Sequence, residues 1–191
     1  AQNVVLNAGD TGDTGSVTAA NNINITDAPF AIGAAVNNGS PSNFIDGLID
    51  EIVVFRDILT TGQIDQIRQG TYAEVFTPTT TTTLFPPSTT TTLPPTPNDF
   101  SLDGNAKALW SFENGELTTD SIGTNTLTDN FTVGTDTVNY KEFDASADFE
   151  KNNSEYLSIT DASLNSGFPL KDGESNDDFS IAFWYKAESQ K

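Results

Sequence analysis

The chain contains no cysteine, no histidine and no methionine. Without cysteine it cannot form a disulfide or a thiolate metal site, and without histidine it lacks the usual zinc ligand and general base. These absences exclude His-based catalytic triads and thiol nucleophiles. The sequence also has no apolar run long enough to span a bilayer, so we expect no membrane insertion.

Basic residues are scarce as well, because 8 Lys and Arg stand against 27 Asp and Glu, for a net charge of −19. Such a surface repels phosphate backbones and anionic lipid headgroups, so we expect no nucleic-acid partner. The same acidity favours solubility and attracts cations. Aromatic residues are plentiful by contrast: 13 Phe, 4 Tyr and 2 Trp are enough to form a β-rich core.

One stretch, residues 77–97, carries no charge and reads TPTTTTTLFPPSTTTTLPPTP. Proline disfavours helix, so we expect an extended polyproline II linker with a reach of roughly 65 Å. Dense Thr with Pro is also typical of O-glycosylated stalks. The alternatives are an unmodified linker, or docking of Leu84, Phe85 and Leu93 onto a neighbour. The candidate O-glycosylation sites are Thr79, Thr80, Thr81, Thr82, Thr83, Thr89, Thr90, Thr91 and Thr92.

The segment before this tract has the pattern of β-strands separated by Gly, Asn and Asp turns. Leu48 to Arg56 (LIDEIVVFR) is apolar on both faces, as a strand covered on both sides should be. Asp50 and Glu51 interrupt it and must be paired, solvated or bound to a cation. Thr60 and Gln63 then form a capping-box pattern, which predicts a short helix.

The segment after the tract predicts further strands. Ala108 to Glu113 (ALWSFE), Tyr156 to Thr160 (YLSIT) and Phe179 to Lys186 (FSIAFWYK) alternate apolar and polar side chains. A polar turn, Asp120 to Asn125 (DSIGTN), follows the first of them. We therefore expect an all-β protein with one short helix.

These motifs resemble those of laminin-G-like domains of the concanavalin A-like lectin and glucanase class. Before the tract, the strand at Phe30 to Gly33, the F-x-G-x-IDE strand at Phe44 to Glu51 and the helical turn at Leu59 to Ile64 resemble the C-terminal part of such a domain. One extra residue before Gly47 departs from the family pattern. After the tract, W-x-F, D-s-x-G-x-N, yL-x-i and F-s-i-x-f-W motifs resemble the N-terminal part. The resemblance implies an antiparallel jelly-roll β-sandwich.

The resemblance also implies three parts. Residues 1–76 correspond to the C-terminal part of one laminin-G-like module, 77–97 to a Thr/Pro-rich linker, and 98–191 to the N-terminal part of the next module. Neither part alone closes a sandwich, and each would leave an apolar sheet edge open. Three arrangements would complete them: a longer tandem repeat, packing of both segments as one permuted domain, or completion of one copy by the next, which builds a fibre.

A structural calcium ion is a further implication of the resemblance, at the place where the first and last strands of the domain meet. Calcium takes about six to eight oxygen ligands, and the corresponding residues are Asp50, Asp120 and Asn125. The alternative is that Asp120 organises its turn and Asp50 accepts hydrogen bonds from neighbouring backbone amides. The acidic stretches Asp10 to Asp13 and Asp172 to Asp178 lack EF-hand features, which indicates solvated turns.

We expect no enzymatic activity. Glycoside cleavage needs two suitably placed carboxylates, but the adjacent Asp50 and Glu51 are predicted to point to opposite faces of their strand. Carbohydrate binding is the common role of the family that the chain resembles. Trp110, Trp184 and Tyr185 are the aromatic candidates for it, although their strand positions favour the core.

The sequence thus predicts a non-enzymatic extracellular or surface protein that makes fibres, stalks or adhesive contacts, with other copies or adjacent modules as partners. The alternative is a carbohydrate-binding, lectin-like module of a larger surface, virion or secreted protein, with glycans as partners. Four N-x-S/T sequons are compatible with N-glycosylation in such a location. They are Asn24, Asn38, Asn130 and Asn152.

Overall fold

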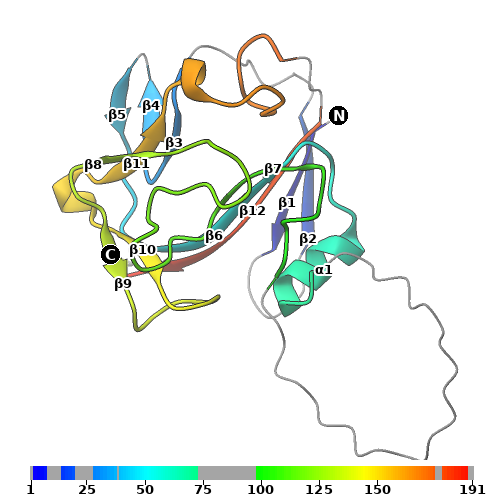
Figure 1. Ribbon diagram of the computed structural model, residues 1–191, viewed down its shortest axis with the longest axis horizontal. Helices are drawn as coiled ribbons and strands as arrows, with labels where there is room; N and C mark the ends of the chain where they lie inside the picture. The colour runs from blue at the N-terminus through cyan, green and yellow to red at the C-terminus, as the bar shows by residue number, and fades with distance from the viewer. Residues whose placement is uncertain are drawn as a thin grey trace, which may run out of the picture.

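The computed structural model describes residues 2–7, 14–19, 28–37, 39–72, 98–174 and 178–188 (Figure 1). Antiparallel strands dominate them, with one α-helix, which confirms the predicted β-rich class. No helix among these residues has the length and apolar character that crossing a bilayer requires. The predictions for the tract at 77–97, with its nine threonine sites, and for Asn24 and Asn38 lie outside the described residues.

The elements follow one another in a simple order along the chain. The strands are β1 (Gln2–Asn7), β2 (Thr14–Ala19), β3 (Phe30–Ile32), β4 (Ala35–Asn37), β5 (Ser40–Ser42), β6 (Gly47–Phe55), β7 (Ala106–Trp110), β8 (Thr128–Asn130), β9 (Gly134–Asp136), β10 (Ser146–Phe149), β11 (Tyr156–Ile159) and β12 (Ser180–Ala187). The helix α1 spans Thr61–Gln69, and two short 3-10 turns span Lys151–Asn153 and Asp161–Ser163.

Strand β6 is the centre of the larger sheet. It pairs with β12 along one side and with β7 and β10 along the other, and β10 pairs in turn with β9. All nine residues of β6 are buried, as its apolar character on both faces predicts. A smaller sheet has the order β3–β11–β8, and the pairs β1–β2 and β4–β5 form two separate two-stranded sheets.

Both sheets combine strands from the two sides of residues 77–97. In the larger sheet β6 precedes these residues, whereas β7, β10 and β12 follow them. In the smaller sheet β3 precedes them, and β11 and β8 follow. The first and last segments therefore pair within a single chain, which is one of the three arrangements that the sequence leaves open.

Side chains of the two sheets meet in the main core. Trp110 of β7 and Phe149 of β10 are fully buried there, and Phe30 stacks on Trp110 with 5.5 Å between ring centroids. Both sheets contribute because one face of each is apolar. The buried members of this core are Ile32, Ile49, Ile52, Val54, Ala108, Trp110, Phe112, Leu127, Val133, Ala147, Phe149, Leu157, Ile159, Leu164 and Phe168.

The opposite face of β6 packs under α1. Val53 and Phe55 join a second cluster there with Ile67 of the helix. The predicted capping box is present, since Thr60 Oγ1 accepts from Gln63 N at 3.3 Å and Gln63 Oε1 accepts from Thr60 N at 2.9 Å. The helix therefore starts where the sequence predicts, and it covers only one end of this face of β6.

Candidate functional site

A β-bulge in β6 places the two acidic residues of that strand. Glu51 and Ile52 of β6 together face Phe183 of β12, and Glu51 has a positive φ of 51°, which is uncommon for a residue with a side chain. The bulge interrupts the alternation: Ile49 and Ile52 both belong to the main core, whereas Asp50 accepts from the backbone of Glu142, and Glu51 shares the side-chain amide of Asn98 with Glu142. The expectation that the two carboxylates point to opposite faces is therefore wrong, because it assumed an unbroken strand.

Asp50, Glu51 and Glu142 form a buried carboxylate cluster, with exposed fractions of 4%, 2% and 6%. Asp50 Oδ2 accepts hydrogen bonds from the backbone N–H groups of Lys141 at 2.6 Å and Glu142 at 3.0 Å. The side-chain nitrogen Nδ2 of Asn98 lies between the two glutamates, 3.4 Å from Glu51 Oε2 and 3.5 Å from Glu142 Oε1. Two further oxygens of the cluster, Asp50 Oδ1 and Glu51 Oε1, are buried without a hydrogen-bond partner.

Burial raises the pKa of all three carboxyl groups. For Asp50 the desolvation outweighs the opposing backbone hydrogen bonds from Glu142 and Lys141. For Glu51, desolvation together with the charge of Glu142 raises the pKa to about 8, and desolvation also raises the pKa of Glu142. The charge of Lys141 opposes the rise for Asp50 and Glu142 but does not cancel it. Glu51 is therefore protonated at neutral pH.

A groove of about 350 Å³ lies beside this cluster, where β6 and β12 meet the segment between β9 and β10. Its lining includes Asp50 and Trp184, and the Lys141 ammonium nitrogen lies 4.8 Å from the centroid of the Trp184 ring. Lys186 Nζ donates to Asn139 Oδ1 at 2.6 Å across the groove. Two of the 8 basic residues of the chain thus line a single groove.

The three aromatic candidates for sugar binding differ in how far the structure buries them. Trp110 is fully buried and donates its indole N–H to Asn125 O at 2.9 Å, as a core residue does. Trp184 is half-buried in the groove wall, and Tyr185 beside it is 50% exposed. Aromatic faces next to amide, ammonium and carboxylate groups are the chemistry that binds polar ring compounds such as sugars.

Asp120 and Asn125, two of the three residues named for calcium, meet in the turn after β7. Asp120 Oδ2 accepts from the Asn125 side-chain amide at 2.8 Å, whereas Asp50 makes its hydrogen bonds elsewhere. Asp120 accepts from five donors in all, an arrangement typical of a carboxylate that organises a turn. They are the backbone N–H groups of Leu109, Ile122, Gly123 and Asn125 and the side-chain amide of Asn125.

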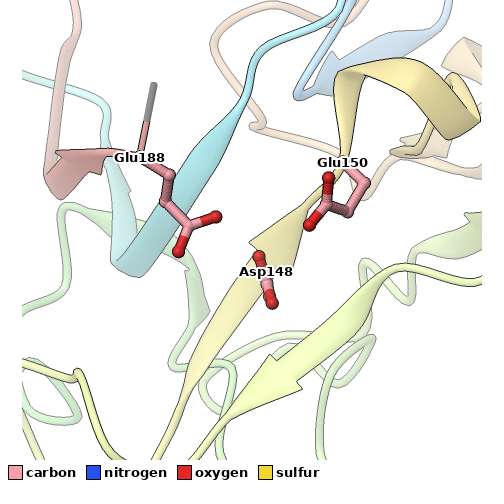
Figure 2. A group of neighbouring side chains, drawn as sticks. All are labelled: Asp148, Glu150 and Glu188. Carbon is pink, nitrogen blue, oxygen red and sulfur yellow. The ribbon is translucent and has the colours of Figure 1, made fainter. Parts of the chain in front are cut away.

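Another acidic group, not identified from the sequence, lies at the far end of the larger sheet. One oxygen each of Asp148, Glu150 and Glu188 lies within 4.8 Å of the others, and Figure 2 shows the side chains converging from β10 and from the end of β12. Asp148 Oδ1 has no hydrogen-bond partner, and burial raises the pKa of Asp148. The alternation of Asp148 and Glu150 along the sequence was a signal for one half of this group, but nothing local indicated Glu188.

The two sequons within the described residues differ in accessibility. Asn152 is exposed in the 3-10 turn Lys151–Asn153. The Asn130 side-chain amide instead donates to Thr128 O and Ser158 Oγ, both at 3.0 Å. Asn152 is therefore the better placed of the two for modification.

Comparison with known proteins finds no family model, no curated protein and no solved structure that matches this chain. The resemblance to laminin-G-like domains thus rests on the sequence motifs alone.

Proposed function

We propose that this chain is a non-enzymatic structural or adhesive protein of the extracellular space or of a cell or virion surface. In this proposal it is built from laminin-G-like modules of the jelly-roll class and associates with copies of itself or with adjacent modules. The motifs support the module, and two antiparallel sheets around a common core are compatible with it.

The observation that carries the proposal is the edge of the larger sheet formed by β12. Strand β12 is the last strand of that sheet, and Ile181, Phe183 and Tyr185 on it are 37%, 54% and 50% exposed. Soluble proteins rarely leave a row of large apolar side chains on an unprotected sheet edge unless another chain covers it. Self-association follows from this edge without any catalytic chemistry.

The burial of the carboxylates also supports a non-enzymatic role. Asp50, the acidic residue in the groove lining, and its neighbours Glu51 and Glu142 are at most 6% exposed, whereas a catalytic acid or base must reach the substrate. With no histidine or cysteine in the chain, these carboxylates would be the most plausible source of catalysis. Their inaccessibility favours a binding or structural role.

Sedimentation velocity and negative-stain microscopy test the proposal. We expect association that increases with protein concentration over the micromolar range, together with elongated or paired particles. A chain that sediments as a monomer up to several hundred micromolar would contradict self-association, whatever surface is responsible for it.

The groove supports a second candidate function, carbohydrate binding. Trp184 supplies an aromatic face, and Asn139 and Lys186 supply polar groups within the same groove. The ring of Tyr185, the next residue along β12, lies on the opposite face of the sheet. A glycan array should then show specific signals that Trp184→Ala and Asn139→Ala reduce. Phe131→Ala, which alters a 65% exposed aromatic outside the groove lining, should leave them unchanged. An array without signals would remove this candidate.

Calcium stays part of the proposal, with two locations to compare. If the ion binds at the turn, Asp120→Asn should abolish the rise in melting temperature on calcium addition. If it binds at the carboxylates of β10 and the end of β12, Glu188→Gln should abolish that rise instead, because their converging oxygens would supply part of the coordination shell. No calcium-dependent rise in the unaltered chain would contradict both locations.

A further inference from the structure

The free edge of β12 has the features of a pairing site. Along one side β12 pairs with β6, and no strand of the described residues pairs with its other side. The strand is eight residues long and contains neither proline nor glycine. Natural sheets usually protect such an edge with short strands, proline, bulges or several charges, and an unprotected edge offers unpaired N–H and C=O groups to another strand.

The same strand carries an exposed apolar stripe, formed by Ile181, Phe183 and Tyr185. These side chains alternate along β12 and share one face of the sheet. The residues of β6 opposite Ile181 and Tyr185 are Val54 and Ile49, which are buried in the main core. The stripe is therefore a continuation of the core face, left exposed because no described segment covers it at this edge.

We propose that β12 pairs antiparallel with β12 of a second copy of this chain, about a two-fold axis at Phe183. This inference rests on the proposed function and names the surface and the partner of the self-association. About that axis Phe183 faces its counterpart, and Ile181 of each copy faces Tyr185 of the other. The two stripes merge into one apolar surface, and such aromatic and β-branched cross-strand pairs stabilise sheets.

The distribution of charge favours a second copy at this edge. Two chains of net charge −19 repel each other over most of their surfaces. Residues 179–187, however, contain one lysine and no Asp or Glu. In the proposed register Lys186 faces Ser180, so no like charges meet within the paired strands, and the acidic residues Asp178 and Glu188 face each other only beyond the strand ends. Salt should therefore strengthen the contact, because it screens the repulsion between the rest of the two chains.

A contact of this kind closes on itself. The same strand is used on both copies, so the product is a dimer rather than an open filament. One strand and three side chains from each copy make a small interface, which is typical of a weak, concentration-dependent dimer. A fibre would need a second, different contact between such dimers.

The absence of cysteine makes a direct crosslinking test possible. Phe183→Cys places one thiol of each copy at the axis, where the Cβ atoms of facing residues come within about 5 Å, close to disulfide range. Under mild oxidation of the full chain we expect a disulfide-linked dimer as the main product. Phe131→Cys, at a 65% exposed phenylalanine away from β12, should remain largely monomeric.

Phe183→Lys is the complementary variant, because a charge at the axis would face its own copy. The side chain is 54% exposed, so the fold should survive, and circular dichroism checks this. We expect dimerisation at least about tenfold weaker in sedimentation equilibrium. Equal crosslinking of the two cysteine variants, or undiminished dimerisation of Phe183→Lys, would overturn the inference.

The outcomes also separate this inference from the proposed function. If Phe183→Lys associates as well as the unaltered chain, self-association stands and only its assignment to β12 fails. If the unaltered chain is a monomer throughout, both fail. Association that is lost on removal of residues 1–19 but kept in Phe183→Lys would assign the contact to the β1–β2 hairpin, against the pairing of β12 with itself.

Discussion

Glu51 combines three unfavourable features in one residue. Its side chain is 2% exposed, its φ is 51°, and its Oε1 has no hydrogen-bond partner. A left-handed non-glycine residue costs roughly 1–3 kcal/mol, and an unpaired buried charge would cost several more. The pKa of about 8 shows how most of the charge penalty is avoided, since the group stays protonated at neutral pH.

This protonation predicts a stability that falls as pH rises. Between pH 4.5, the ordinary value for Glu51, and about 8 in the folded state, the folded chain holds a proton that the unfolded chain has released. Raising the pH across this window therefore favours unfolding. Glu51→Gln removes the titration while keeping the shape. At pH 8 it should be more stable than the unaltered chain by about 4 kcal/mol, and near pH 4.5 the two should be similar.

Urea unfolding at several pH values between 4.5 and 8 measures this difference. Glu116→Gln, at an exposed glutamate, is the matched control and should follow the unaltered chain. Some dependence on pH should persist in Glu51→Gln, because burial also raises the pKa of Asp50 and Glu142. If the stability of Glu51→Gln and that of the unaltered chain depended on pH with the same slope, the pH dependence would not come from Glu51.

At the level of elements, the contact between β6 and β12 depends on a glycine. Gly47 begins β6 with a φ of 144°, a conformation that residues with side chains rarely adopt. A Cβ atom there would collide with the backbone carbonyl of Lys186 and lie 3.1 Å from Ala187 Cα. The glycine of the F-x-G-x-IDE motif is thus explained by the close approach of β12.

We expect Gly47→Ala to lower the free energy of unfolding by about 2–4 kcal/mol, because it adds both a clash with β12 and backbone strain. Gly104→Ala is the control, since a Cβ atom at Gly104 meets nothing within 4 Å. Chemical unfolding followed by tryptophan fluorescence measures both variants. A loss at Gly47 no larger than at Gly104 would show that β12 does not approach β6 this closely.

The whole molecule is organised by strand pairing across residues 77–97. Strand β6 has one neighbour along one side and two along the other, and all three come from the segment after the tract. Without them, the nine buried residues of β6 would lie open on both edges. The two segments therefore depend on each other, and neither has a complete core alone.

This dependence predicts complementation between fragments. Residues 1–76 and 98–191, expressed separately, should each lack cooperative unfolding, and their mixture should form a one-to-one complex with the β-sheet signal of the intact chain. Val54→Asp in the first fragment is the control, because Val54 is fully buried in the main core and a charge there should prevent assembly. Independent folding of either fragment would contradict the mutual dependence.

The sequence alone determined the features that depend on neighbouring residues. Alternation predicted the strands at Tyr156 to Thr160 and Phe179 to Lys186, and the structure has β11 and β12 there. The apolar run at Leu48 to Arg56 predicted a strand covered on both sides, and Thr60 with Gln63 predicted the start of α1. These predictions were possible because side-chain alternation and helix capping act over a few residues.

Only the tertiary structure decided which distant residues meet. Asp50 accepts a hydrogen bond from the backbone of Glu142, 92 positions away, and the bulge that turns Glu51 toward Asn98 exists in the register between β6 and β12. The tertiary structure also decided where the groove lies and that β12 is an edge strand. The sequence showed that this strand is apolar but not where it lies in the sheet. The physical reason is that strand pairing joins segments far apart in the chain, whereas sequence patterns record only local geometry.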